Sequence, residues 1–187
     1  IRPAGPADAD ALALVGAATF LETYAGLVDG GAIIAHCAEH HAPASYRALL
    51  GESGGGGARA WLAEIDPGAA PVGYALVSAP TLAQARDGDL ELRRIYSLSR
   101  FHGAGIGPAL LDAVIAAAAG HARLLLGVKK DNHRALAFYA KHGFVHAGTR
   151  EFFVGGNRYD DFVLARALAP EPALDPAPHR APESTEP

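Results

Sequence analysis

Three glycines at alternate positions, Gly103, Gly105 and Gly107, lie between a strand-like segment and a helical one. Glycine lets a backbone approach a ligand closely, because it has no Cβ. The unpaired amides that open the following helix, together with the helix dipole, favour an anion. The spacing therefore predicts a loop that binds phosphate or pyrophosphate, with simple tight turning as the alternative.

The residues around the loop separate three kinds of phosphate site. A Walker loop needs Lys and Ser or Thr after its last glycine, but Pro108 follows Gly107 here. A dinucleotide loop needs a third glycine one position later and an acidic residue about 20 residues on. Lys129 and Lys130 stand near that second position instead. The third option is the pyrophosphate loop of an acyl-CoA binder.

The stretch HGAGIGPALL, from His102 to Leu111, is followed in residues 132–144 by the pattern N-x-x-A-x-x-F-Y-x-K-x-G-F. Found together and in this order, the two halves resemble the GNAT superfamily of N-acetyltransferases. The segments TFLETYAG, ELRRIY, LGV, ALAFYAKHGFVHAG and DDFVLARAL are similar to its polyamine N-acetyltransferase branch. The resemblance covers residues 1–168 and implies an α/β fold. That fold has a mostly antiparallel sheet of six to seven strands, helices on both faces, and a bulged, splayed central strand pair at the acyl-CoA site.

The sequence departs from the family pattern at three places. His102 stands where the first loop residue is commonly Gln or Arg, and Pro108 stands where a basic residue is common. Proline fits the first turn of a helix but contributes no amide. Lys129 and Lys130 replace the Trp-Glu pair of the similar branch, which weakens the case for a polyamine substrate.

The resemblance implies acetyl-CoA as the acetyl donor and no metal. Ile95, Tyr96 and Ser97 would pair with the pantetheine arm, and a nearby backbone amide would polarise the thioester carbonyl. Asn132 would contact the pantetheine arm or order the start of its helix, and Lys141 would reach a CoA phosphate. The backbone amides of the loop would hold the pyrophosphate; they belong to His102, Gly103, Ala104, Gly105, Ile106 and Gly107.

Acetylation of an amine by a thioester needs a neutral amine and a proton for the departing thiolate. An amine with a pKa near 10.4 costs about 4–5 kcal/mol to deprotonate at pH 7. The resemblance makes Tyr139 the candidate general acid; a half-buried helix aromatic is the alternative. Glu91, on the strand that enters the bulge, is the candidate general base, and its alternative is a solvent-facing partner of Arg93. Glu22 and a water chain are rival proton acceptors.

A second cluster contains His36, Cys37, Glu39, His40 and His41. His36 and His40 are one helical turn apart and could share a metal, but zinc sites need three or four ligands. No further ligand set is evident, so we expect no metal and interpret the segment as a histidine-rich helix near the acceptor site. Cys37 is not expected to act as a nucleophile with His36, because adjacent helical residues point about 100° apart.

The pattern of apolar residues supplies the elements that position these groups. It predicts helices at 6–24, 31–50 with a break near Pro43, 108–121 and 132–143. It predicts strands at 58–66, 71–79, 89–98, 123–128, 144–153 and 158–168. A slip in alternation between Leu92 and Ile95 indicates a β-bulge. Asp160 and Asp161 are expected to cap or turn before the last strand.

Composition limits the alternatives. The chain has 187 residues and a net charge of −4, which argues against nucleic-acid binding. One cysteine excludes a disulfide framework. The first residues lack a basic start, so no signal peptide is expected, and no apolar run reaches the roughly 18 residues that span a bilayer. We therefore expect a cytoplasmic protein without membrane partners, folded as one domain over 1–168 with a Pro- and Ala-rich tail at 169–187.

The sequence thus predicts an enzyme that moves the acetyl group of acetyl-CoA to a primary amine of a small molecule, by direct attack in a ternary complex. A protein or peptide amine acetyltransferase is one alternative. A regulatory module that binds acyl-CoA without turnover is another. A homodimer is compatible with the resemblance.

Overall fold

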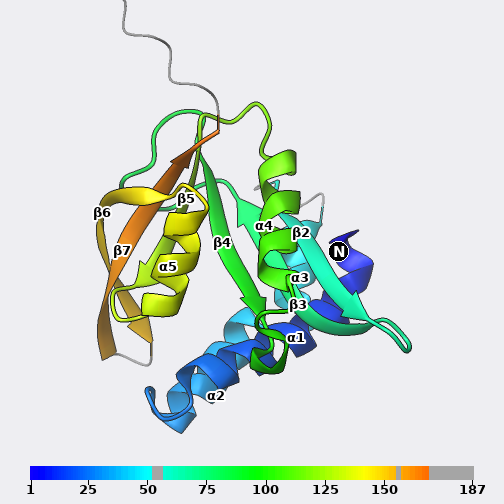
Figure 1. The fold of residues 1–187 in the computed structure, drawn as a ribbon. Coiled ribbons are helices and arrows are strands. Elements are labelled where there is room, and N and C mark those ends of the chain that lie inside the picture. Colours follow the sequence, from blue (N-terminus) through cyan, green and yellow to red (C-terminus); the bar gives the residue numbers. More distant parts are fainter. Residues whose placement is uncertain (52–56, 155–156, 169–187) are drawn as a thin grey trace, which may run out of the picture.

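The structure, a computed structural model, describes residues 1–51, 57–154 and 157–168 (Figure 1). Its helical elements are η1 (Pro6–Asp8), α1 (Ala9–Tyr24), α2 (Gly30–His40), α3 (Pro43–Leu50), η2 (Ser99–Phe101), α4 (Ile106–Ala117) and α5 (His133–Lys141). Its strands are β1 (Arg2–Ala4), β2 (Arg59–Ile65), β3 (Ala70–Ser78), β4 (Leu90–Ser97), β5 (Arg123–Lys129), β6 (Val145–Val154) and β7 (Asn157–Ala167). The tail predicted at 169–187 lies outside the described residues.

The strands form one seven-stranded sheet in the order β1-β2-β3-β4-β5-β7-β6. Every neighbouring pair is antiparallel except β4 and β5, which run parallel. A parallel pair needs a crossover connection, and α4 supplies it by packing over β2, β3 and β4. The predicted mixed, mostly antiparallel α/β fold is confirmed.

The centre of the sheet is splayed. β4 and β5 pair only at Leu90 with Leu124 and at Glu91 with Leu125, whereas β5 pairs with β7 along its whole length. The two strands visibly diverge below this short junction (Figure 1). Beyond Glu91, the edge of β4 that faces β5 therefore has no strand partner within the described chain, and a gap opens in the sheet.

The predicted bulge is present at the start of this gap. Leu92 lies opposite Val77 and Arg94 lies opposite Leu76, so Arg93 is the extra residue. An extra residue shifts the alternation of side chains by one. It therefore places Leu92 and Ile95 on one face of the sheet, and Glu91 and Arg94 on the other.

Helices cover both faces of the sheet (Figure 1). Alternate residues of β3 serve two separate cores, as the two-residue period of a strand requires. Tyr74 and Leu76 pack under α1 and α3, whereas Ala75 and Val77 pack under α4. α4 and the N-terminal helices therefore lie on opposite faces of the sheet.

Three features differ from the sequence-based expectations. The segment 31–50 forms two helices that meet at Pro43, as its break indicated, but β1 and η1 were not predicted. α4 begins at Ile106, two residues before the predicted start. The turn or capping role expected for Asp160 and Asp161 is wrong, because both lie inside β7 and Asp161 is buried. Within the described ranges, no helix is long and apolar enough to cross a membrane.

Candidate active site

The glycine loop connects the splayed end of β4 to α4. Gly103 and Gly105 have φ angles of 87° and 81°, the left-handed region that favours glycine. The amides of His102 and Ala104 are used inside the turn, since they donate to Ser99 O and Phe101 O. The four other loop amides make no hydrogen bond to the described residues; they belong to Gly103, Gly105, Ile106 and Gly107. Four donors at a helix N-terminus that no described residue occupies are chemically suited to an anion.

A cation that the sequence reasoning missed lies beside this loop. Arg134, in the first turn of α5, donates from Nη1 to Nδ1 of His102. Nε2 of His102 lies 3.1 Å from Ser97 O and 3.0 Å from Nη2 of Arg134. His102 and Pro108 stand where the family commonly has Gln or Arg and a basic residue, respectively. Arg134 brings a positive charge to the same place from a different element.

Ile95, Tyr96 and Ser97 form the part of β4 that borders the gap. On the other edge they pair with Ala75, Tyr74 and Gly73 of β3. A Cβ on Gly73 would come within 2.8 Å of Tyr96 O and 3.2 Å of Ile106 Cγ2. Glycine at this position therefore lets β3, β4 and the first turn of α4 approach closely, which holds the loop against the strand.

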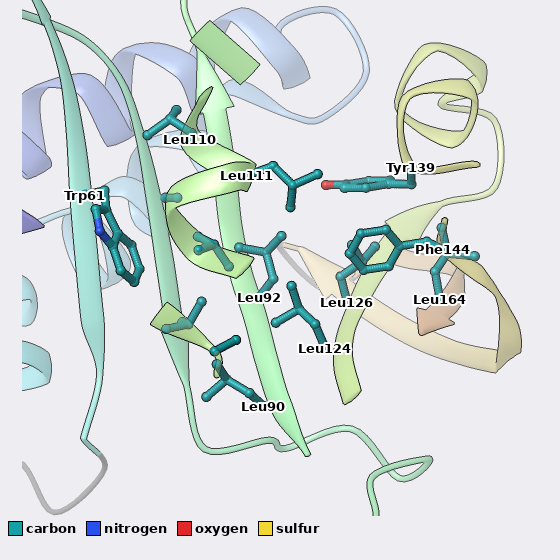
Figure 2. Packing of buried hydrophobic residues seen from close by; sticks show 14 of the residues in the cluster. Trp61, Leu90, Leu92, Leu110, Leu111, Leu124, Leu126, Tyr139, Phe144 and Leu164 are labelled. Atoms are coloured by element: carbon teal, nitrogen blue, oxygen red, sulfur yellow. The ribbon is translucent and has the colours of Figure 1, made fainter. Parts of the chain in front are cut away.

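Tyr139 reaches into the gap from α5. Its ring extends toward Leu111 of α4 and packs against Phe144 (Figure 2). The residue is 8% exposed, and its hydroxyl makes no hydrogen bond to any described residue. Burial raises the pKa of Tyr139, and the phenol of Tyr96 raises it further. The hydroxyl therefore keeps its proton at neutral pH and can donate it.

Two further phenols meet at the gap from the other face of the sheet. Tyr96 of β4 and Tyr24 of α1 influence each other's pKa, and burial is the main reason that the pKa of each is raised. Tyr96 also raises the pKa of Tyr139, so the phenols of α1, β4 and α5 interact electrostatically.

Both candidate bases, Glu91 and Glu22, already accept hydrogen bonds from neighbouring residues. Glu91 is 3% exposed and accepts hydrogen bonds from the amide and hydroxyl of Thr81, at 2.6 and 3.1 Å. Arg93 lies 3.4 Å from its other oxygen, which is the ion pair weighed as the alternative role. Glu22 is exposed and accepts from the amide and hydroxyl of Ser99, at 2.8 and 3.2 Å. Both carboxylates lie at β4, one where it parts from β5 and one at its end.

The remaining predicted residues lie on α5 and on the segment before it. Asn132 caps α5, because its side chain accepts from the amide of Ala135 at 3.1 Å. Lys141 lies at the far end of the helix, seven residues and about 10 Å beyond Arg134. Lys129 pairs with Asp131 at 2.9 Å, and Lys130 lies 3.7 Å from Asp160.

The histidine cluster packs under α1. His41 Nδ1 and the Tyr46 hydroxyl are 2.9 Å apart, and a Cβ on Gly16 would lie 2.4 Å from both. The pKa of His36 is lowered to about 4 and that of His41 to about 3. Burial is the main cause, and the neighbouring histidines and Arg94 contribute the rest. In the described parts of the chain, no group of three or more His, Cys, Asp or Glu is placed to hold a metal ion. Burial raises the pKa of the Cys37 thiol.

Comparison with known proteins agrees with this geometry. The family model for the acetyltransferase (GNAT) family matches residues 20–144, which include the splayed strand, the glycine loop and α5. The chain belongs to the GNAT acetyltransferase family. An N-acetyltransferase of Mycobacterium bovis and one of Mycobacterium tuberculosis, both named as uncharacterized, are each 43% identical over 99 residues. That match covers 52% of this chain and 60% of the length of each relative.

Solved structures share the GNAT fold. The PaiA N-acetyltransferase of Thermoplasma acidophilum, determined in complex with coenzyme A, superposes with a TM-score of 0.68 at 18% identity, over 89% of this chain and 99% of that one. A GNAT acetyltransferase of Streptococcus pneumoniae superposes with a TM-score of 0.62 at 25% identity, over 89% and 97%. The fold is thus common to this GNAT chain and to proteins of distant sequence.

Proposed function

We propose that this GNAT protein transfers the acetyl group of acetyl-CoA to a primary amine of a small molecule. The observation that carries the proposal is that three features lie near one gap in the sheet. They are four loop amides without a partner among the described residues, the edge of β4 that lacks a strand partner there, and the Tyr139 hydroxyl. The three features match what the reaction needs, namely a phosphate anchor, an extended track for the donor's arm and a proton source.

Acetyl-CoA would bind with its pyrophosphate at the glycine loop and its pantetheine arm along β4. The amides of Gly103, Gly105, Ile106 and Gly107 would accept the pyrophosphate, with Arg134 adding a positive charge. The pantetheine arm would run along Ile95, Tyr96 and Ser97, whose free strand edge offers backbone hydrogen bonds. Lys141 would reach a phosphate on the outer part of the donor. This path would leave the thioester in the gap.

Chemistry would follow from direct attack in a ternary complex. The neutral amine nitrogen bonds to the thioester carbonyl carbon, the carbon–sulfur bond breaks, and the thiolate takes the proton of the Tyr139 hydroxyl. The nitrogen then gives up its extra proton, which would return through water to the Tyr139 phenolate and leave a neutral amide. A backbone amide of the bulged strand would stabilise the oxyanion. The raised pKa of Tyr139 keeps its proton available, which suits a general acid.

The amine must lose a proton before it attacks. Glu91 is our candidate base, acting through water. It is buried where β4 and β5 separate, on the α1 face of the sheet, which we take as the acceptor face. Glu22 is the rival, since it lies at Ser99 beside the other end of the gap. Both are tied to neighbouring donors, so a water relay without a single base is the third route.

The test is thiol release from acetyl-CoA across a panel of amines, with acetyl-CoA binding measured in parallel. We expect binding in the micromolar range or tighter and release with one class of small amine. Release only with peptides would favour a protein or peptide acetyltransferase, and binding without release would favour a regulatory module. Absence of acetyl-CoA binding would overturn the proposal. Light scattering on the same sample would test the homodimer that the resemblance allows.

A further inference from the structure

A partly buried arginine on the acceptor face has no role in the proposed transfer. Arg94 follows the bulge on β4 and directly precedes Ile95. Its guanidinium carbon lies 5.6 Å from the ring centre of Tyr46, over the ring face. Tyr96, two positions along the strand, shares its side of the sheet and stacks on Tyr74 with 6.1 Å between ring centres. Arg94 is therefore surrounded by aromatic rings from β3, β4 and α3.

Arg94 has no countercharge among the residues that the structure describes. No carboxylate of the described residues forms a salt bridge with it, and its Nη1 atom is buried without a hydrogen-bond partner. Two buried carboxylates on this face, Glu91 and Asp161, already have partners. Glu91 is held by Thr81 and Arg93, and Asp161 accepts from Arg150 at 3.1 and 3.2 Å.

A second buried donor lies beside Arg94. Tyr74 is fully buried, at 0% exposure, and its hydroxyl has no hydrogen-bond partner within the described chain. The rings of Tyr74 and Tyr46 are 6.2 Å apart between their centres, and Arg94 lies over the ring of Tyr46, so the three groups are close. The Tyr46 hydroxyl is itself paired with His41. Two orphaned donors on adjacent strands are rare, because leaving a buried polar group unpaired is costly.

The other ionisable groups around Arg94 do not neutralise it. His36 and His41 are uncharged at neutral pH, since burial lowers their pKa values. The phenols of Tyr46, Tyr74 and Tyr96 have raised pKa values and remain protonated. The cluster thus carries one net positive charge and hydrogen-bond donors that lack acceptors.

We propose that Arg94 and the Tyr74 hydroxyl bind a carboxylate carried by the acceptor, so that the acceptor is an amino acid or a similar amine with a carboxylate. This inference rests on the proposed acetyl transfer and deepens it. The two oxygens of a carboxylate match a guanidinium and a hydroxyl as donors. A polyamine would instead need unpaired carboxylates on this face, where Glu91 and Asp161 are both engaged.

The position also suits the reaction. Arg94 is adjacent to Ile95, the first residue of the track proposed for the pantetheine arm, and lies on the opposite face of the sheet from Tyr139. An acceptor anchored at Arg94 would approach the gap from the α1 face. Its amine could then reach through the opening lined by Tyr24 and Tyr96 to the thioester.

The experiment compares each amino acid with the amine that lacks only its carboxylate. Lysine is paired with cadaverine and phenylalanine with phenethylamine, and lysinamide keeps the lysine frame without the charge. Thiol release from acetyl-CoA by the full chain is followed for each, with spermidine included. We expect kcat/KM at least tenfold higher for one of the amino acids than for its decarboxylated partner and its amide.

Variants assign the effect to the two donors. Arg94→Gln should raise KM for the preferred amino acid at least tenfold, change kcat little and leave the KM for acetyl-CoA unchanged, and Arg94→Lys should restore part of the loss. Tyr74→Phe should raise the same KM several-fold. Arg47→Gln is the matched control, because Arg47 is an exposed arginine on α3 that pairs only with Asp10.

Three results would count against the inference. Turnover of cadaverine or spermidine as fast as lysine would overturn it while the proposed acetyl transfer stands. An unchanged KM for the amino acid in Arg94→Gln, in a variant that unfolds at the wild-type temperature, would also overturn it alone. Acetyl-CoA binding without release from any amine would overturn the proposed function, and this inference with it.

Discussion

Arg134 at the start of α5 is hydrogen-bonded to His102 at the entrance of the glycine loop, so the cation next to the loop comes from a different element than the loop itself. His102 in turn contacts Ser97 O at the end of β4. This chain of contacts ties the loop, the splayed strand and α5 together at the point where a phosphate would bind.

Replacing Arg134 with Gln should weaken acetyl-CoA binding about tenfold, since a hydrogen bond to a charged group is worth about 1.5–3 kcal/mol and this one is exposed. Isothermal titration with acetyl-CoA would measure the change. Acetyl-pantetheine, which lacks the pyrophosphate, should bind the variant and the wild type equally. An equal loss for both ligands would show that Arg134 shapes the fold and does not contact phosphate.

The left-handed conformation of Gly105 gives a second prediction. Gly105→Ala should cost about 1–2 kcal/mol of stability through strain, and its Cβ should also intrude on the bound phosphate. Gly120→Ala is a matched control, because Gly120 has a similar φ of 90° and equally open surroundings but lies at the other end of α4. Both variants should lose similar thermal stability, and only Gly105→Ala should lose acetyl-CoA affinity. Retained affinity in Gly105→Glu would refute the loop assignment.

The hydroxyl of Tyr139 can be removed without breaking a contact, because it makes no hydrogen bond to the described residues. Tyr139→Phe should therefore keep the unfolding temperature and the acetyl-CoA affinity of the wild type. If the hydroxyl protonates the leaving thiolate, kcat should fall by about 10²–10⁴-fold. A kcat within threefold of the wild type would assign the ring to packing alone.

The candidate bases can be separated by the pH dependence of kcat/KM. Glu91→Gln removes the charge and keeps an oxygen that can accept from Thr81. If Glu91 takes the amine proton, the variant should lose the acidic limb of the profile and at least tenfold in rate at pH 7. Glu22→Gln serves as the comparison, and an unchanged profile in one variant eliminates that residue as the base.

The sequence predicted the parts of the site that are continuous in the chain. The glycine loop, the bulge near Arg93 and the α5 motif each depend on neighbouring residues, so their spacing could be recognised. The short β1 was missed, since three residues show no periodicity. Asp161 was misplaced because two acidic residues in a row resemble a turn, although their strand is paired on both sides.

Contacts between distant segments left no such signal. The Arg134–His102 contact joins residues 32 positions apart. The cluster around Arg94 draws on α3, β3 and β4, and each of its tyrosines alone is indistinguishable from a core aromatic. Only the register of β3 against β4, which places Leu76 opposite Arg94 and Tyr74 opposite Tyr96, brings the two unpaired donors together.

The buried histidines predict how stability depends on pH. His36 and His41 have pKa values of about 4 and 3 in the folded protein, below the value of about 6.5 expected in the unfolded chain. The unfolded state therefore binds more protons below pH 6.5, so stability is at its full value above that pH and declines as the pH falls toward 4. Denaturant unfolding between pH 4 and 7.5 would measure the decline. His36→Gln should flatten it, whereas His133→Gln, at an exposed position on α5, should not. The same slope in His36→Gln and in the wild type would mean that His36 is not a source of the acid sensitivity.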